Sequence, residues 1–296
     1  MMKKSIQNNS MLQDNQQTFL AVEENSNIVK YNSFGILTEK QNLWTPEAQK
    51  SIFFTAVQVS APLPVSIILS DNDNDFLTIR ITEPFSSVGQ RFPSPYKLGT
   101  NNSIMVSTSD ENMECNAFGA ANATQAAFNG RSDFSNVNNA IGLHNGSLAI
   151  LNSALLNQSS GRIILEYTML PSEYEFLEIK QVIIKYYCRL SLTLAVGVSS
   201  MILYWRPNSQ ENWTQLQKID LSLIGTINHL TTPIEYDITD TVLGASDPWG
   251  VINNLQTSFV GIHTGLGLGN VVQLDAIEIE ICMTGKNQIT LLGYEA

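Results

Sequence analysis

The chain has 296 residues, of which 43% are hydrophobic and only 15% are charged, and 16 Lys and Arg against 27 Asp and Glu give a formal net charge of −11. Phosphate-backbone binding needs clustered cations, and the one basic doublet is Lys3-Lys4, so nucleic acid and an anionic membrane surface are excluded as expected partners. Asn, Ser, Thr and Gln replace the missing charges, and such neutral polar surfaces suit proteins that pack against other proteins.

The first 45 residues are polar, with scattered apolar positions and no lasting helical or strand period. Low hydrophobicity of this kind predicts a flexible arm. The alternative is an arm that becomes ordered only against a neighbouring subunit. No apolar core follows the lysine pair, so this segment is not expected to be a secretory signal.

Strands are expected between residues 46 and 83. Runs rich in β-branched and aromatic residues indicate them at 51–59, 65–69 and 76–81, and a turn-forming cluster, Asp71 to Asp75, separates the last two.

The next segment, 84–161, is predicted to be irregular. Five Pro and Gly residues in Pro84–Gly99 indicate a loop, and small and amide residues dominate 107–160. One short amphipathic helix is expected near Gly146–Asn157. A structureless loop of this length is rare inside a compact domain, so we interpret 84–161 as an insertion with contacts of its own.

From residue 162 to 285, short strands follow one another closely. We expect them at 163–169, 176–187, 190–196, 201–205, 234–238, 259–263 and 271–283. One helical turn interrupts them, because Asp247 can cap a helix and Pro248 suits its first position. Many short strands with little helix predict a sandwich or a barrel.

The uncharged stretch Leu190–Trp205 is short for a membrane span, and it alternates between apolar and polar residues. It is therefore predicted to be strand, and no membrane association is expected.

The last strand changes its apolar parity near Asp275. Either Asp275 points into the core, or a bulge at Asp275-Ala276 shifts the register. The bulge is favoured, because a buried lone carboxylate is costly.

Three cysteines, Cys115, Cys188 and Cys282, lie far apart, and no CxxC pair occurs. An odd number cannot be fully paired within the chain. Reduced, buried thiols are the simplest interpretation, in keeping with synthesis in a cytoplasm.

The three histidines, His144, His229 and His263, lack the spacing of zinc ligands. No GxSxG sequence and no legible Ser/His/Asp group occurs either. We therefore predict no catalytic residue, no metal ligand and no cofactor, and the chain is not expected to be an enzyme.

The alternation of Asp71, Asp73 and Asp75 is similar to the start of a calcium-binding loop. However, Phe76 stands where that loop needs Gly, and Thr82 stands at its twelfth position in place of Glu. A solvated turn is the better interpretation.

Tyr204, Trp205 and Trp213 flank a loop between two expected strands. Aromatic side chains at the edge of a sandwich can stack on sugar rings or contact a partner, whereas the commoner use of such residues is in a core or an interface. These three are the candidate carbohydrate or partner contacts.

Residues 174–283 resemble the jelly-roll, galactose-binding-like domains of bacteriophage and other viral virion proteins. The resemblance lies in the order of its strands, in Tyr236-Asp237-Ile238-Thr239, in the Asp247-Pro248-Trp249 turn and in the closing segment Leu274-Asp275-Ala276-Ile277. It implies a virion or carbohydrate-facing role, and a fold of this kind carries many functions.

The predicted architecture is therefore mainly β, a jelly-roll-like antiparallel sandwich with an N-terminal arm and an irregular insertion. Its parts are the arm 1–45, the sandwich 46–285 with strands in 46–83 and 162–285, the insertion 84–161 and the C-terminal tail 286–296. The expected function is that of a virion structural protein (capsid, decoration or tail-associated) that contacts other virion proteins or copies of itself. The alternative is a carbohydrate-binding attachment module with a glycan as partner.

Overall fold

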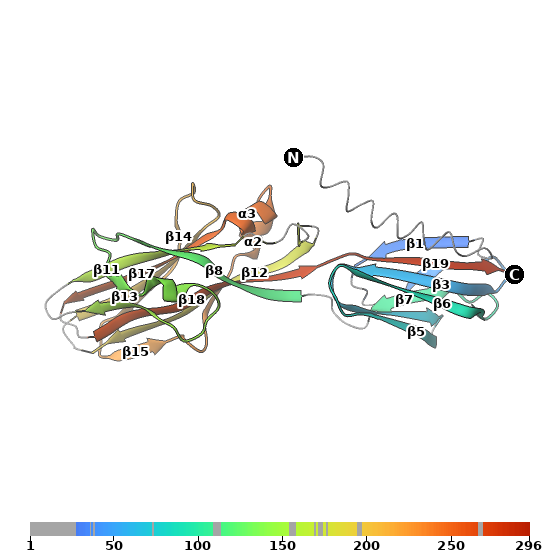
Figure 1. Ribbon diagram of the computed structural model, residues 1–296, viewed down its shortest axis with the longest axis horizontal. Coiled ribbons are helices and arrows are strands. Elements are labelled where there is room, and N and C mark those ends of the chain that lie inside the picture. Colours follow the sequence, from blue (N-terminus) through green and yellow to red (C-terminus); the bar gives the residue numbers. More distant parts are fainter. Residues whose placement is uncertain are drawn as a thin grey trace. The chain divides into compact units, whose positions relative to one another are not determined.

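The computed structural model describes residues 28–35, 37, 39–72, 74–108, 114–153, 158–168, 170, 174–175, 177–193, 197–265 and 269–296. These residues are mainly β, in antiparallel sheets that form sandwiches, which confirms the predicted fold class (Figure 1). The chain divides into two compact units, of which unit 2 spans Met113–Met283 and unit 1 takes the residues on either side.

Unit 1 is a sandwich of two four-stranded antiparallel sheets. Its first sheet has the order β1 (Ile28–Phe34), β19 (Asn287–Glu295), β3 (Ile52–Ala61) and β6 (Ser86–Lys97). Its second sheet has the order β2 (Gln41–Trp44), β7 (Ile104–Thr108), β4 (Val65–Asp71) and β5 (Asn74–Ile81). Side chains from both sheets, among them Trp44, Phe54 and Ile67, form one apolar core.

The loop expected over 84–99 is wrong, because most of it is strand β6. Among the strands that the structure describes, β6 pairs only with β3 and lies at the edge of its sheet. Its two prolines, Pro93 and Pro95, fall between Arg91 and Tyr96, where the ladder with β3 shifts register. Proline is tolerated on an edge and at a bulge, since no ladder hydrogen bond is needed there.

The two expected terminal segments are also strands in unit 1. Residues 28–34 form β1 and 41–44 form β2, whereas residues 1–27 of the expected arm lie outside the described residues. The expected tail 286–296 contains β19, which lies between β1 and β3 and buries Ile289 and Leu291.

Unit 2 has two layers joined along one strand. The first layer has the order β14 (Thr214–Leu221), β13 (Gly197–Arg206), β17 (Gln256–Gly265), β11 (Ser159–Tyr167) and β8 (Glu114–Ala126). The second is built on β18 (Gly269–Thr284) with β12 (Glu178–Leu192), β10 (Ala149–Ser153), β9 (Phe134–Ser135), β15 (Gly225–Asn228) and β16 (Ile234–Asp237). Strand β8 serves both layers, because its first half pairs with β18 and its second half with β11.

This division differs from the single sandwich 46–285 with an insertion at 84–161. The strands of 46–83 belong to unit 1, those of 162–283 belong to unit 2, and segment 84–161 supplies strands to both units. The helix expected near Gly146–Asn157 is wrong for its described part, where Ala149–Ser153 is strand β10 paired with β18. Pairing with a distant strand, and not the local spacing of apolar residues, determines the secondary structure of this segment.

The remaining short elements of unit 2 are helical. They are η1 (Val137–Ala140), α2 (Thr239–Leu243) and α3 (Pro248–Asn254). The expected cap of α3 is confirmed, since Gly250 N donates to Asp247 Oδ1 at 2.9 Å. The segment Leu190–Trp205 lies in β12 and β13 apart from Thr193, which follows β12, and 194–196, which fall outside the described residues. In the part of the chain that the structure describes, no helix is long and apolar enough to cross a membrane.

Asp275 is buried, with 3% of its surface exposed. The favoured prediction of a bulge at Asp275-Ala276 is therefore wrong, and the alternative, in which Asp275 points into the core, is confirmed. Its carboxylate accepts hydrogen bonds from Asn145 N at 3.1 Å and Gly146 N at 2.9 Å. The shift of register between β10 and β18 falls instead between Leu151 and Asn152. A buried carboxylate is tolerated here because backbone N–H groups satisfy it.

The prediction of three reduced thiols is wrong for two of them. Cys115 of β8 and Cys282 of β18 face each other in the ladder, with Cα atoms 3.9 Å apart, and form a disulfide. Cys188 is a free, buried thiol, and burial raises its pKa to about 12. The 167-residue separation of the two bonded cysteines hides their proximity from a sequence-based argument.

Reduction of this disulfide should destabilise unit 2. The bond closes a loop with a sequence separation of 167 residues, and its loss frees the unfolded chain, which lowers the free energy of unfolding by about 2–5 kcal/mol. Urea titrations of the oxidised protein, with and without a reductant, measure the difference. In the C115S/C282S double variant the reductant should have no further effect, and a continued effect would mean that another group is responsible.

Candidate functional site

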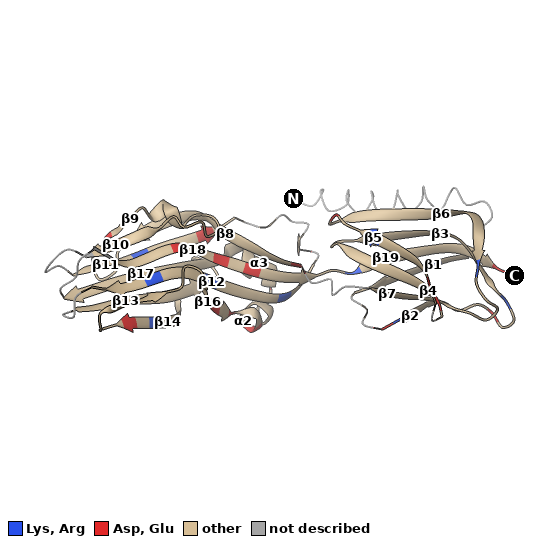
Figure 2. Cartoon of the chain, turned by 90° about the horizontal axis from the view of Figure 1, so that it is seen from below, with Lys and Arg blue, Asp and Glu red and all other residues tan. Residues whose placement is uncertain are grey.

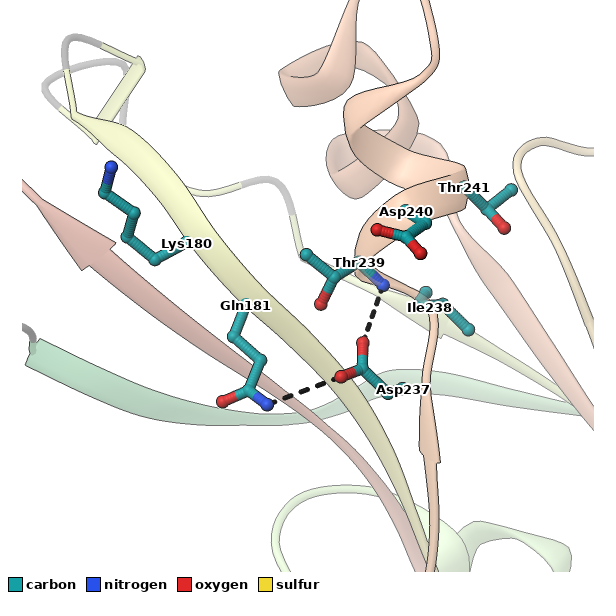
Figure 3. Close-up of a pocket in the computed structure, with 7 residues that line it drawn as sticks. All are labelled: Lys180, Gln181, Asp237, Ile238, Thr239, Asp240 and Thr241. Atoms are coloured by element: carbon teal, nitrogen blue, oxygen red, sulfur yellow. Dashed lines mark hydrogen bonds between the residues drawn. The ribbon is translucent and has the colours of Figure 1, made fainter.

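One hollow in unit 2 lies beside helix α2 and has a volume of ≈ 510 Å³ (Figure 3). Its lining residues come from β12, from the end of β16 and from α2. They are Lys180, Gln181, Asp237, Ile238, Thr239, Asp240 and Thr241.

The polar groups of this hollow mostly serve the local fold. Asp237 Oδ1 accepts from Thr239 N at 2.9 Å, Asp237 Oδ2 accepts from Gln181 Nε2 at 3.4 Å, and Thr239 Oγ1 accepts from Val182 N. The hydrogen bonds from the Thr239 side chain and backbone hold the pKa of Asp237 below its usual value. These bonds fix the start of α2 against β12.

The histidines lie apart from one another. His144 Nδ1 lies 2.8 Å from Glu278 Oε1, and its ring stacks on Tyr187 with centroids 4.1 Å apart. His229 Nδ1 contacts the carbonyl of Thr232, and His263 is buried in the core. Among the described residues, no three His, Cys, Asp or Glu side chains gather as a metal site requires.

The pairing of four strands places a grid of side chains on one face of the first layer of unit 2. Direct partners across a ladder point to the same face, and residues two apart on a strand share that face. The row through Tyr204 continues through Ser258, Ile164 and Thr124. The row on one side runs Ile202, Val260, Arg162 and Ala126, and the row on the other runs Arg206, Gln256, Glu166 and Asn122.

A cluster of arginine and aromatic side chains covers this face. The Arg162 guanidinium lies 5.4 Å from the ring centroid of Phe128, 5.2 Å from that of Tyr204 and 5.5 Å from that of Trp213. The Arg206 guanidinium lies 4.2 Å from the Trp213 centroid. Because the face of an aromatic ring attracts a cation, the rings hold both guanidinium groups in place. We call Phe128, Arg162, Tyr204, Arg206 and Trp213 the arginine–aromatic cluster.

A chain of hydrogen bonds positions Arg206 across the same face. Arg206 Nε donates to Gln256 Oε1 at 2.8 Å, and Gln256 Nε2 donates to Glu166 Oε1 at 2.7 Å. The other carboxylate oxygen of Glu166 accepts from Asn122 Nδ2 at 3.1 Å. This network links four neighbouring strands, β13, β17, β11 and β8, and so makes the face rigid.

Arg162 has an unusual electrostatic environment. Burial lowers its pKa from the ordinary value, and the charge of Arg206 lowers it further, although Tyr204 acts in the opposite direction. Within the described residues, neither guanidinium has an ion-pair partner, and two buried atoms of this face, Arg162 Nε and Ser258 Oγ, have no hydrogen-bond partner. The described part of this face therefore carries two guanidinium groups without a salt bridge and one carboxylate, that of Glu166, in a chain of formal charge −11.

The structure brings together two of the three predicted contact residues. Tyr204 and Trp213 are partly exposed and belong to the cluster, whereas Trp205 is buried, with 4% of its surface exposed. Trp205 follows Tyr204 on β13 and so points to the opposite side of the sheet. Sequence reasoning missed Arg162 and Arg206, although both are cations in strands, where an apolar or neutral residue is usual.

No protein-family model matches the sequence, and no curated protein matches it. Solved structures show weak similarity. The tandem CBM22-1-CBM22-2 domain of Xyn10C from Paenibacillus barcinonensis is 10% identical, with a TM-score of 0.21 over 86% of this chain and 91% of that one. Allantoicase is 11% identical, with a TM-score of 0.19 over 83% of this chain and 80% of that one. A chain from the structure of infectious bursal disease virus, Gx strain, is 7% identical, with a TM-score of 0.18 over 91% of this chain and 76% of that one.

The two neighbouring tryptophans should respond differently to truncation. Trp205→Ala opens a cavity in the core and should lower the free energy of unfolding by about 3–5 kcal/mol. Trp213→Ala removes a partly exposed ring and its two guanidinium contacts, for a loss of about 2 kcal/mol or less. Urea titration of both variants measures the two values, and equal losses would contradict the opposite placement of the two rings.

Proposed function

We propose that this chain is a virion structural protein, a capsid, decoration or tail-associated component, that acts through contacts with other virion proteins or with copies of itself. The proposal rests on the edge of unit 1 at β1, which no other described strand covers. The resemblance of residues 174–283 to virion jelly-roll domains points in the same direction.

Among the described strands, β1 is the outer strand of the first sheet and pairs with β19 alone. The outer edge of such a strand presents backbone N–H and C=O groups that can pair with another chain. On β1, Val29 and Tyr31 are 50% and 56% exposed, and the Lys30 ammonium lies 5.9 Å from the Trp44 ring centroid. This edge therefore combines hydrogen-bonding capacity with exposed apolar surface.

The opposite edge of the same sheet is better protected. Strand β6 carries Pro93 and Pro95, whereas β1 has no proline, and proline is a residue with which proteins block edge pairing. The contrast between the two edges favours β1 as the contact strand.

Charge is scarce over both units. Figure 2 shows Lys and Arg scattered singly along the described strands. A protein that buries much of its surface in an assembly avoids the cost of desolvating charges, and the low charge content supports such a role.

A second candidate function is a carbohydrate-binding attachment module, and the exposed placement of Tyr204 and Trp213 on one sheet face favours it. An aromatic ring offers a flat apolar surface to the C–H groups of a sugar. Binding to a glycan array that Trp213→Ala abolishes would support this candidate. A folded protein that binds no glycan would refute it.

A charge on the β1 edge should disrupt the proposed assembly. The double variant Val29→Lys/Tyr31→Lys places two ammonium groups on the contact strand, and both would have to lose their water in the assembly. Incorporation of the chain into particles should therefore fall at least tenfold. Quantitative mass spectrometry of purified particles measures incorporation. Val198→Lys, an exposed position in unit 2, is the matched control and should assemble as the wild type does. Unchanged incorporation of the β1 variant would contradict the role of this edge, and particles that lack the wild-type chain would contradict the proposed function.

A further inference from the structure

We propose that the arginine–aromatic cluster binds a saccharide that carries a carboxylate or a sulfate group. The inference deepens the carbohydrate-binding candidate and rests on it. It names the chemical class of the ligand, which neither the fold nor the aromatic residues alone provide.

The first step of the argument is charge. Arg162 and Arg206 both contact the ring of Trp213, and the charge of Arg206 disfavours the charged form of Arg162. Among the described residues no carboxylate forms a salt bridge with either guanidinium, and the Glu166 carboxylate is linked to Arg206 only through Gln256. The Arg206 nitrogens already donate to Gln256 Oε1 and to the carbonyl of Glu211. A carboxylate or sulfate beside the two guanidinium groups would therefore reduce this repulsion mainly through its charge.

The second step is the unmet hydrogen-bonding capacity beneath the cluster. Ser258 is fully buried between the rows of Arg162 and Arg206, and its Oγ has no hydrogen-bond partner among the described residues. Arg162 Nε lies in the same region and is also without a partner there. A ligand on the surface would not contact these two buried atoms directly. Buried polar groups are usually satisfied, so the two mark a local cost in the folded state of the kind that functional sites retain.

The third step is the surrounding apolar surface. Phe128, Tyr204 and Trp213 lie around the guanidinium groups, so a ligand that reaches the cations also meets aromatic carbon. A small free anion would leave that surface unused. A sugar ring offers both an apolar C–H face for the rings and, in its acidic forms, the charge for the arginines.

The fourth step excludes a long polyanion. The formal net charge of −11 repels a ligand that spreads charge over many residues, and the described Lys and Arg form no continuous stripe on the strands (Figure 2). One or two anionic groups in an otherwise neutral saccharide fit a cation pair that occupies one part of one sheet face.

Binding of matched saccharide pairs to the full-length protein tests the inference. The pairs are sialyllactose against lactose, a glucuronate-containing disaccharide against its glucose counterpart, and a sulfated against an unsulfated chondroitin disaccharide. We expect the acidic member of at least one pair to bind at least tenfold more tightly than the neutral member, and to weaken as salt concentration rises. The pair that shows the difference identifies carboxylate or sulfate as the recognised group.

Variants then assign the binding to this cluster. Arg206→Gln and Trp213→Ala should each weaken acidic-saccharide binding at least tenfold, while Arg80→Gln, an exposed arginine on β5 of unit 1, should leave it unchanged. Circular dichroism of each variant establishes that it is folded. Should either cluster variant unfold, the comparison of acidic with neutral saccharides on the wild type still decides the outcome.

The remaining outcomes separate the two proposals. Equal binding of acidic and neutral saccharides would overturn the inference and leave the carbohydrate-binding candidate intact. Absence of binding to every saccharide would overturn both. Equally strong binding to single-stranded DNA, unaffected by Trp213→Ala, would show nonspecific attraction of anions and would also overturn the inference.

Discussion

The pairing of β8 with β18 is the interaction on which both units depend. The chain enters unit 2 through β8 and leaves it through β18, and the Cys115–Cys282 disulfide joins these two strands in register. Beyond β18 the chain supplies β19, which lies between β1 and β3 in unit 1. Unit 1 therefore cannot complete its first sheet until the chain has passed through unit 2. This connectivity demands many long-range contacts, and such topologies fold slowly.

The same strand positions the arginine–aromatic cluster. The second half of β8 pairs with β11 and so places Asn122 beside Glu166 and Phe128 near Arg162. The first half pairs with β18 and carries the disulfide. A rigid ligand-binding face needs supporting strands whose register is fixed, and the disulfide fixes one end of this strand. Stability and binding are thus linked through β8. A thiol pair made in a reducing cytoplasm and oxidised outside the cell would fit the proposed virion, because extracellular conditions favour disulfides.

Local patterns predicted the strands that bury one face and the cap at Asp247, since alternation and capping act over a few residues. They failed where distant pairing decides the structure. The prolines of β6 indicate a loop, yet an edge position and a register shift accommodate them. The tail strand β19 and the two bonded cysteines are recognisable only through partners more than 160 residues away. Asp275 looked too costly to bury, because the two backbone donors that satisfy it belong to a loop about 130 residues earlier.

The candidate site shows the same difference between local patterns, which the sequence reveals, and distant contacts, which it hides. Trp213 and Tyr204 were found because aromatic residues near a loop are conspicuous in a sequence, and strand alternation would have placed Trp205 on the opposite side from Tyr204. Arg162 was not found, because a lone arginine in an apolar strand looks like a solvent-exposed residue. Its meaning depends on Arg206, which is 44 positions away in the sequence and reaches the same Trp213 ring across β17. A pair of like charges on one face costs free energy in the absence of an anion. Such a cost in the folded state is the kind of local conflict that binding sites retain, since the ligand relieves it.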